Sequence, residues 1–150
     1  MALEKRNSQR YIFLADDDSD DRDFFADAMM EIQPDIILKQ ARDGMYLMED
    51  LLKLSDTEIP EFIFLDINMP RKSGLECLEE IRSHENLNHV SIIMLSTSSN
   101  PENIDRSMEL GATFYAVKPS SFEKLKSLLE AVLSVNLVGS IEEKKKFLLV

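Results

Sequence analysis

Three short apolar runs limit what this chain can fold into more than any other feature of its sequence. They are YIFLA (11–15), FIFLD (62–66) and SIIMLS (91–96), and none of them alternates with polar residues. Strands that are covered on both faces have this composition, whereas a strand with one face in water alternates. Two less uniform runs, IILKQA (36–41) and TFYAVK (113–118), predict two further strands nearer the edges of the same sheet.

Segments with the spacing of amphipathic helices follow the predicted strands. The clearest has apolar residues at positions i, i+3, i+4, i+7 and i+8 from Leu125 onward. Ser73 and Gly74 are typical of a helix start, and Pro101 and Gly111 of a start and a stop. The apolar faces of the five predicted helices lie at 24–32, 44–54, 75–81, 104–110 and 125–133.

The regular alternation of strands and helices predicts an α/β fold. Parallel strands joined by right-handed helical crossovers form a doubly wound sheet with helices on both faces. For the five predicted strands we expect the flavodoxin-like (βα)5 arrangement with strand order 2-1-3-4-5. In that arrangement ligands bind where the winding reverses, at the carboxyl ends of strands 1 and 3.

The length of the chain favours a single domain. With 150 residues it is long enough to bury a core but too short for two ordinary domains. We expect an N-terminal arm at 1–10, the folded domain at 11–135 and a C-terminal tail at 136–150. For the tail the open alternatives are an extra helix, a frayed end, an interface element such as a homodimer contact, and a segment that folds back onto the domain.

The composition excludes several classes of site. Cys77 is the only cysteine, which excludes an internal disulfide and a thiolate metal cluster. His84 and His89 lack the spacing of zinc ligands and give little support to a Ser-His-Asp triad. The net charge of −11 argues against direct nucleic-acid binding, which needs clustered lysine and arginine. The expected partner is therefore a protein or a cation.

The sequence shows neither a membrane span nor a secretory signal. Its apolar runs are much shorter than the roughly 20 residues that a transmembrane helix needs. The basic N-terminus MALEKRNSQR is not followed by an apolar stretch that ends in small residues. We therefore expect a cytoplasmic protein that does not bind membranes.

Acidic residues crowd the end of the first predicted strand. The stretch LADDDSDDRD (14–23) places six aspartates between positions 16 and 23. Two carboxylates about 4 Å apart repel by about 4 kcal/mol at an effective dielectric constant of about 20, so a helix N-terminus, water or a cation must offset the repulsion. For Asp20, Asp21 and Asp23 we favour a helix start, because the helix dipole attracts negative charge there.

The predicted fold brings distant polar residues to one end of the sheet, where the carboxyl ends of the parallel strands meet. The residues at the ends of strands 1, 3, 4 and 5 are Asp16 with Asp17, Asp66, Ser96 and Lys118. Carboxylate oxygens are ligands that Mg²⁺ prefers, so this edge predicts a magnesium site. A carboxylate beside Mg²⁺ can attack phosphorus, while a lysine and a hydroxyl neutralise the phosphoryl oxygens.

Five short motifs resemble those of a known family. LADDD, FLDINMP, KSG, MLST and VKP occur in the order, and at nearly the spacing, of the receiver domains of two-component response regulators. The resemblance covers residues 11 to about 135. It is greatest to the stand-alone chemotaxis-type receivers and to the small regulators paired with phytochrome-like kinases. It implies a phosphoprotein of phosphorelay signal transduction that carries an aspartyl phosphate.

The resemblance implies a role for each residue of the carboxyl edge. Asp66 matches the phosphoacceptor, and Lys118 matches the lysine that contacts the phosphoryl group. Asp16 and Asp17 match an acidic pair that holds Mg²⁺ together with Asp66 and the backbone carbonyl of Asn68.

The resemblance also implies residues that respond to phosphorylation. Ser96 stands where the family has a hydroxyl that follows the phosphate on activation, and Tyr115 matches the aromatic switch position. Asn68 and Ser98 occupy positions that help to set the dephosphorylation rate. These roles are expectations for the present chain.

The expected function is that of a single-domain response regulator rather than an enzyme. It would receive a phosphoryl group from a sensor histidine kinase or a phosphotransfer protein and then change its affinity for a downstream protein target. One alternative is a Mg²⁺-dependent phosphatase of the haloacid dehalogenase type, with Asp16 and Asp18 as its two acids; another is a receiver-like module that binds partners without phosphorylation. The family further implies a cis peptide bond between Lys118 and Pro119.

Overall fold

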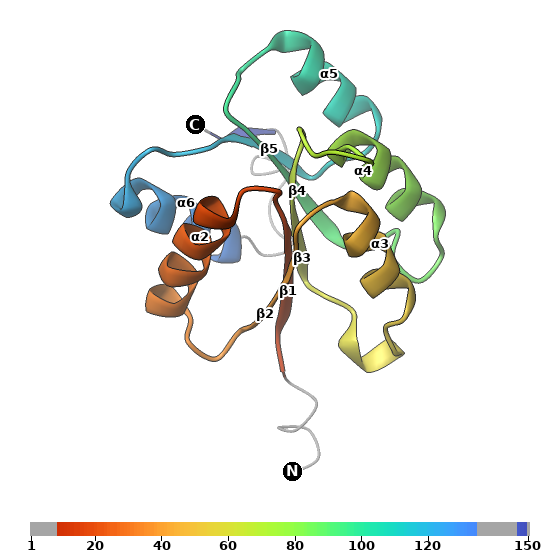
Figure 1. Ribbon diagram of the computed structural model, residues 1–150, viewed down its shortest axis with the longest axis horizontal. Helices are drawn as coiled ribbons and strands as arrows, with labels where there is room; N and C mark the ends of the chain where they lie inside the picture. Colours follow the sequence, from red (N-terminus) through yellow and green to blue (C-terminus); the bar gives the residue numbers. More distant parts are fainter. Residues whose placement is uncertain (1–8, 135–146, 150) are drawn as a thin grey trace.

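A parallel sheet forms the middle layer of the computed structural model, which describes residues 9–134 and 147–149 (Figure 1). The strands lie in the order β2-β1-β3-β4-β5-β6, and every adjacent pair is parallel. Their bounds are β1 Tyr11–Ala15, β2 Ile37–Ala41, β3 Phe62–Asp66, β4 Ser91–Ser96, β5 Phe114–Val117 and β6 Leu148–Leu149.

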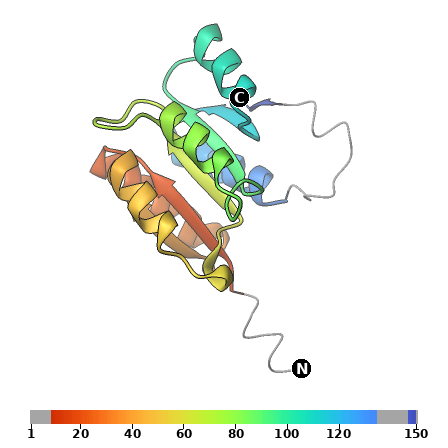
Figure 2. The same cartoon turned by 90° about the vertical axis from the view of Figure 1, so that its right-hand side faces the viewer.

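Helices cover both faces of this sheet. They are α2 Ser19–Ile32, α3 Gly44–Leu52, α4 Gly74–Ser83, α5 Pro101–Glu109 and α6 Phe122–Ser134, together with the short 3-10 helix η1 Asp56–Glu58. The pair α2 and α6 packs against one face, and α3, α4 and α5 lie on the other (Figures 1 and 2). The doubly wound α/β prediction is confirmed. Among the described helices, none has the length and apolar character needed to cross a membrane.

Each central strand contributes to two separate cores. In β1, Phe13 and Ala15 join the core beneath α3 and α4, whereas Ile12 and Leu14 join the core beneath α2 and α6. Successive residues of a strand point to opposite faces, and both faces of this sheet are covered by helices. The absence of polar alternation in the strongest apolar runs follows from this arrangement.

Local sequence signals define the ends of several helices. Ser73 caps α4 in a capping box with Glu76. Pro101 takes the first turn of α5, and Gly111 follows that helix with a φ of 97°, which a residue without a Cβ atom adopts at little cost. These predicted helix ends are confirmed. The weaker strand predictions were slightly too long, because β2 begins one residue later than 36 and β5 loses one residue at each end of 113–118.

The prediction of five strands was wrong, because a sixth strand lies at the edge of the sheet beside β5. Strand β6 places Leu148 beside Tyr115, whose backbone N–H donates to the carbonyl of Phe147 at 2.9 Å. An edge strand has N–H and C=O groups without ladder partners, and a short apolar segment can satisfy them. The predicted order 2-1-3-4-5 is otherwise correct. Residues 1–8 and 135–146 lie outside the described residues, so the bounds of the arm and tail stay predictions.

Candidate functional site

The carboxyl ends of the central strands meet at the upper end of the sheet in Figure 1. Strand β1 ends one residue before Asp16, β3 ends at Asp66, β4 ends at Ser96, and Lys118 directly follows β5. Because the strands are parallel, all of these side chains belong to the same edge. The candidate site is therefore assembled from four strands that are far apart in the sequence.

Three carboxylates form a compact group at this edge. Asp16, Asp17 and Asp66 each offer an oxygen, and these oxygens lie within 4.8 Å of one another. Asp16 and Asp66 are buried, whereas Asp17 is exposed. Hard oxygen donors at this spacing, with one side open to water, fit the needs of Mg²⁺, which keeps several water ligands.

Asn68 lies next to this group in the loop after β3. Its backbone N–H donates to Asp66 Oδ1 at 3.1 Å, which fixes one carboxylate oxygen. Within residues 9–134 and 147–149, the carbonyl of Asn68 accepts no hydrogen bond. That oxygen is therefore free to join the carboxylates as a metal ligand.

Lys118 is the cation of the site. Its Nζ donates to Asp16 Oδ2 at 2.9 Å, to Asp21 Oδ2 at 3.0 Å and to Asp66 Oδ2 at 3.2 Å. Burial alone would lower the pKa of this ammonium group, but the hydrogen bond to Asp16 and the charge of Asp66 outweigh burial and raise it. Lys118 therefore stays protonated at any physiological pH.

The carboxyl group of Asp66 has an unusually high affinity for protons. Burial raises its pKa to about 6; the ammonium of Lys118 opposes this shift, and the charge of Asp16 adds to it. A carboxylate that is poorly stabilised as an anion gains more from a cation or from a covalent bond to an electrophile. Asp66 is thus the member of the group best placed to act as a nucleophile.

The loop after β4 connects this edge to the interior of the sheet. Ser96 is fully buried, and its Oγ accepts a hydrogen bond from the backbone N–H of Ser98 at 3.1 Å. Tyr115 is also fully buried, and its hydroxyl donates to the carbonyl of Ser98 at 2.7 Å. The backbone N–H of Lys118 donates to the carbonyl of Ser96 at 2.8 Å. One loop thus contacts both the hydroxyl at the site and the buried tyrosine.

The expected cis peptide bond between Lys118 and Pro119 was wrong. Residues 9–134 and 147–149 contain no cis peptide bond, so this bond is trans. The trans form is the lower in energy before proline, and only about 5–6% of such bonds in folded proteins are cis.

The acidic run at 16–23 divides between the site and the start of α2. Asp18 caps the helix, and its Oδ1 accepts from the backbone N–H groups of Asp20 at 2.8 Å and of Asp21 at 3.2 Å. Asp21 also contacts Lys118, which the sequence analysis did not anticipate. Side chains in a first helical turn point back toward the N-terminus, and this was the available signal.

An ion pair between the buried Asp43 and the exposed Arg71 was also not anticipated. Asp43 caps α3 by accepting from the backbone N–H of Tyr46 at 2.9 Å, and its other oxygen accepts from Nε and Nη2 of Arg71 at 3.1 and 2.8 Å. Burial alone would raise the pKa of Asp43, but the Tyr46 amide and the Arg71 guanidinium hold it below its usual range. Arg71 has a φ of 67°, so this contact holds the loop after β3 in an unusual backbone conformation.

Gly74 allows α4 to approach the end of β3. A Cβ atom at this position would lie 2.3 Å from the backbone oxygen of Asp66, far inside van der Waals contact. The requirement for glycine in the KSG motif is therefore steric.

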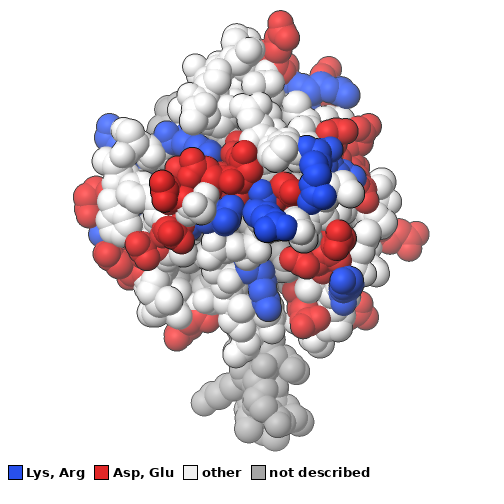
Figure 3. All heavy atoms as spheres, viewed as in Figure 1, with Lys and Arg blue, Asp and Glu red and all other residues white. Residues whose placement is uncertain are grey.

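The surface around the site carries both signs of charge. In the face shown in Figure 3, Asp and Glu side chains gather near the middle, and Lys and Arg side chains lie directly beside them. An anion that approaches this edge meets an acidic centre with a basic border.

Comparison with known proteins gives a consistent result. A family model described as the response regulator receiver domain matches residues 12–130. Response regulator Rcp1 of Synechocystis sp. (strain ATCC 27184 / PCC 6803 / Kazusa) is 28% identical over 134 residues, which cover 87% of this chain and 91% of Rcp1. A "Probable cyclic di-GMP phosphodiesterase" of Vibrio cholerae is 33% identical over 120 residues, but the match covers 80% of this chain and only 26% of that protein.

Solved structures of small response regulators share the fold. The phosphorylated cyanobacterial phytochrome response regulator RcpA matches with a TM-score of 0.74 and 29% identity, over 83% of this chain and 91% of RcpA. The Mn²⁺-bound form of Rcp1 matches with a TM-score of 0.72 and 28% identity, over 83% of this chain and 92% of Rcp1.

Proposed function

Because the chain belongs to the response regulator receiver family, we propose that it is a signalling protein that accepts a phosphoryl group on Asp66. The donor would be a phosphohistidine of a sensor histidine kinase or of a phosphotransfer protein. The observation that carries this proposal is the 3.2 Å contact between Asp66 Oδ2 and Lys118 Nζ, beside the carboxylates of Asp16 and Asp17. A nucleophile, a cation and a set of metal ligands thus share one site.

The proposed metal is Mg²⁺. Asp16, Asp17, Asp66 and the backbone carbonyl of Asn68 would hold it, because all four offer hard oxygen ligands. When bound, the ion supplies positive charge to the phosphoryl oxygens. The Mn²⁺-bound form of the similar protein Rcp1 supports a divalent cation in this fold.

In the proposed transfer, a carboxylate oxygen of Asp66 attacks the phosphorus of the donor. A P–O bond forms, the P–N bond to the donor histidine breaks, and the imidazole leaves with the electron pair of that bond. The ammonium of Lys118 exchanges part of its contact with the carboxylates for the phosphoryl oxygens. Water later attacks the acyl phosphate, releases inorganic phosphate and restores the carboxylate. The phosphorylated form of the similar protein RcpA supports this chemistry.

The loop after β4 would transmit the event to the rest of the molecule. The hydroxyl of Ser96 would turn toward a phosphoryl oxygen, and the loop that it now contacts through Ser98 would move with it. Because Tyr115 donates to the carbonyl of Ser98, that movement would remove the hydrogen-bond acceptor of the tyrosine and let its side chain reorient.

Asn68 and Ser98 are exposed at the mouth of the site. There they would control the access of water to the acyl phosphate and so help to set the dephosphorylation rate.

The proposed output is a change in affinity for a downstream protein target rather than a catalysed reaction. The surface that changes would be formed by α5, β5 and α6, which lie next to the loop that contacts Tyr115.

A homodimer is a further proposed form of the molecule, and the cytoplasm is its proposed location.

Labelling with acetyl phosphate or binding of beryllofluoride, each with Mg²⁺, tests the acceptor. Wild type is expected to gain one phosphoryl group per chain by mass spectrometry, and Asp66→Asn none. Asp23→Asn, which removes an exposed acid outside the site, is the matched control and is expected to be labelled normally. Equal labelling of wild type and Asp66→Asn would overturn the assignment.

A turnover assay separates this proposal from the phosphatase alternative. A haloacid dehalogenase-type enzyme would release many phosphates per chain from small phosphate esters, with Asp16 as nucleophile and Asp18 as acid. The carboxylate of Asp18 instead caps α2. We therefore expect no repeated release of phosphate from such esters, and steady turnover that survives Asp66→Asn would favour the enzyme.

A further inference from the structure

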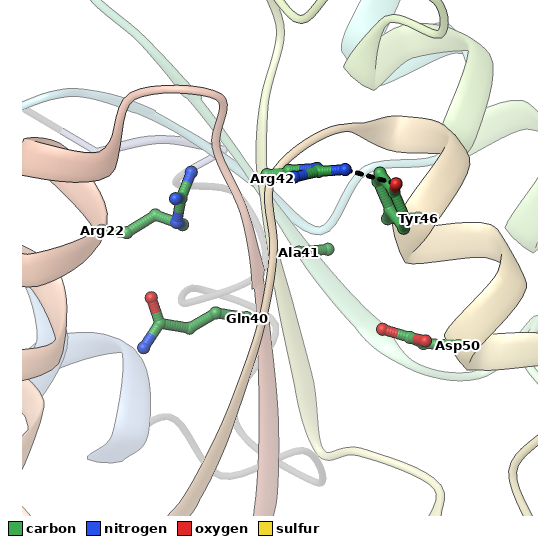
Figure 4. Close-up of a pocket in the computed structure, with 6 residues that line it drawn as sticks. All are labelled: Arg22, Gln40, Ala41, Arg42, Tyr46 and Asp50. Carbon is green, nitrogen blue, oxygen red and sulfur yellow. Dashed lines mark hydrogen bonds between the residues drawn. The ribbon is translucent and has the colours of Figure 1, made fainter.

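Two arginines and a tyrosine line a hollow beside the proposed phosphorylation site (Figure 4). Arg22 enters it from α2, and Arg42 and Tyr46 lie on the opposite side, in the loop after β2 and the first turn of α3. The hollow has a volume of about 250 Å³. We call it the arginine hollow; its lining residues are Arg22, Gln40, Ala41, Arg42, Tyr46 and Asp50.

The guanidinium groups of the arginine hollow have no acidic partner in the described part of the chain. Neither Arg22 nor Arg42 forms an ion pair there, although the whole chain has 28 acidic residues against 17 lysines and arginines. Arg10, Arg71 and Arg106 each pair with a carboxylate. Two guanidiniums without an ion-pair partner, at a hollow that has Asp50 as its one acidic lining residue, favour an anionic ligand.

Arg42 is held in a defined position. Its guanidinium carbon lies 4.3 Å from the centre of the Tyr46 ring, and one of its N–H groups donates to the Tyr46 hydroxyl. The guanidinium of Arg71 approaches the same ring at 5.2 Å. Stacking on an aromatic ring orients the planar fork and leaves its other N–H groups available for oxygen acceptors. Such a fork binds phosphate or carboxylate oxygens in pairs.

Arg22 connects the arginine hollow to the acidic group. Its Nη1 donates to the backbone carbonyl of Asp16 at 2.7 Å, and the side chain of Asp16 contacts Lys118. A phosphodonor carries negative charge toward three carboxylates that are balanced by one lysine, so the acidic group repels it until a cation is bound. Positive charge at the border of the site would raise the local concentration of such a donor.

We propose that the arginine hollow is an anion-binding site that captures the phosphoryl dianion of a phosphodonor on its way to Asp66. This inference depends on the proposed function, because it assigns the hollow to the donor of that reaction. Two forked guanidiniums supply the charge and the geometry, and the amide of Gln40 supplies a further donor. Asp50 lies at the side of the hollow away from the contact of Arg42 with Tyr46 (Figure 4). Its negative charge would repel the anion and so favour a position next to the arginines. The dianion can come from a small donor such as acetyl phosphate or from a phosphohistidine.

Titration with sodium sulfate tests binding without phosphorylation. We would follow the amide and arginine Nε–H signals of Asp66→Asn protein by NMR, without Mg²⁺ and at constant ionic strength. Saturable shifts of Arg22, Arg42 and the amides around Tyr46 are expected, and Arg42→Gln should weaken binding on the order of tenfold. Arg106→Gln, the same change at an exposed arginine on α5, should bind sulfate normally. Shifts that do not saturate, or that are equal in both variants, would overturn the proposal.

Labelling kinetics then identify the source of the dianion. If small donors use the hollow, Arg42→Gln should slow labelling by acetyl phosphate at low ionic strength, and the difference from wild type should shrink as salt screens the charges. Saturable sulfate binding with unchanged labelling by acetyl phosphate assigns the hollow to protein-borne phosphohistidine. Because the binding experiment uses protein without Asp66, a failure to bind sulfate would leave the phosphoacceptor assignment intact. Equally, a failure to label Asp66 would leave the sulfate-binding result intact.

Discussion

Asp66 is a buried carboxyl group that the fold stabilises poorly as an anion. Its pKa of about 6 lies above the value of about 3.9 for an unfolded chain. At a pH between these two pKa values, the folded state therefore binds more protons than the unfolded state. Stability therefore falls as the pH rises from about 4 to about 6, and the loss persists at higher pH.

Asp66→Asn is accordingly expected to stabilise the protein at pH 8 in the absence of divalent cations. The gain should be about 1–3 kcal/mol in the free energy of unfolding and should disappear near pH 4, where the wild-type carboxyl is neutral. Urea denaturation at both pH values measures it, with the exposed Asp23→Asn as control. A destabilised Asp66→Asn at pH 8 would mean that the contact with Lys118 outweighs burial.

The sequence predicted the residues of the site that follow directly from strand ends. Asp16, Asp66 and Lys118 lie at the ends of apolar runs, and parallel pairing brings such positions together. Asp21 and Arg71 could not be found in this way. Their contacts depend on how far a side chain reaches across a helical turn or a loop. For Asp21 the backward tilt of side chains in a first helical turn was the one available signal, whereas the spacing of strand ends gives none for Arg71.

At the scale of the element, α4 depends on a close approach to the end of β3. Gly74→Ala would place a Cβ atom 2.3 Å from the backbone oxygen of Asp66, so the helix or the strand must shift. We expect a loss of about 1–3 kcal/mol in the free energy of unfolding, as for other overpacked sites, together with slower labelling of Asp66. Thermal denaturation and acetyl phosphate labelling measure the two effects.

Ser73→Ala is the matched comparison for this change. It removes the cap of the same helix without adding atoms and is expected to cost about 1 kcal/mol, with labelling close to that of wild type. If both variants were labelled equally slowly, the effect of Gly74→Ala would come from the helix end rather than from the contact with Asp66.

Elements with strong periodicity were predictable, and those defined by their neighbours were not. The strands at 11–15, 62–66 and 91–96 have their predicted bounds, because their apolar runs end sharply at polar residues. Strand β6 has only two residues and no periodicity of its own. It exists because the edge of β5 is available, and this is a property of the assembled sheet.

At the scale of the whole molecule, β6 attaches the C-terminal segment to the sheet by pairing with β5. Deletion of residues 147–150 would remove the hydrogen bond from Tyr115 to Phe147 and the packing of Phe147 and Leu149 against the cores. We expect a folded protein with a free energy of unfolding lower by about 1–3 kcal/mol. Denaturation by urea measures the loss, and Leu148→Ala, at a position that is 39% exposed, is the control with a smaller effect.

The same deletion examines the proposed homodimer. Sedimentation of the full chain and of the shortened chain at matched concentrations reports whether the C-terminal segment contributes to association. An unchanged oligomeric state would remove the tail from the dimer contact, while leaving the strand pairing with β5 in place.

The two cores of the sheet have a consequence for strand alignment. Because β1, β3 and β4 are apolar on both faces, hydrophobicity alone would tolerate a slip of one residue, which merely exchanges the side chains of the two cores. The polar residues at the strand ends oppose such a slip. A shift of β3 by one residue would bury the carboxylate of Asp66 between the sheet and its covering helices. The carboxylate proposed to carry the phosphoryl group thus also helps to fix the register of β3, so that one side chain serves both the proposed chemistry and the alignment of the sheet.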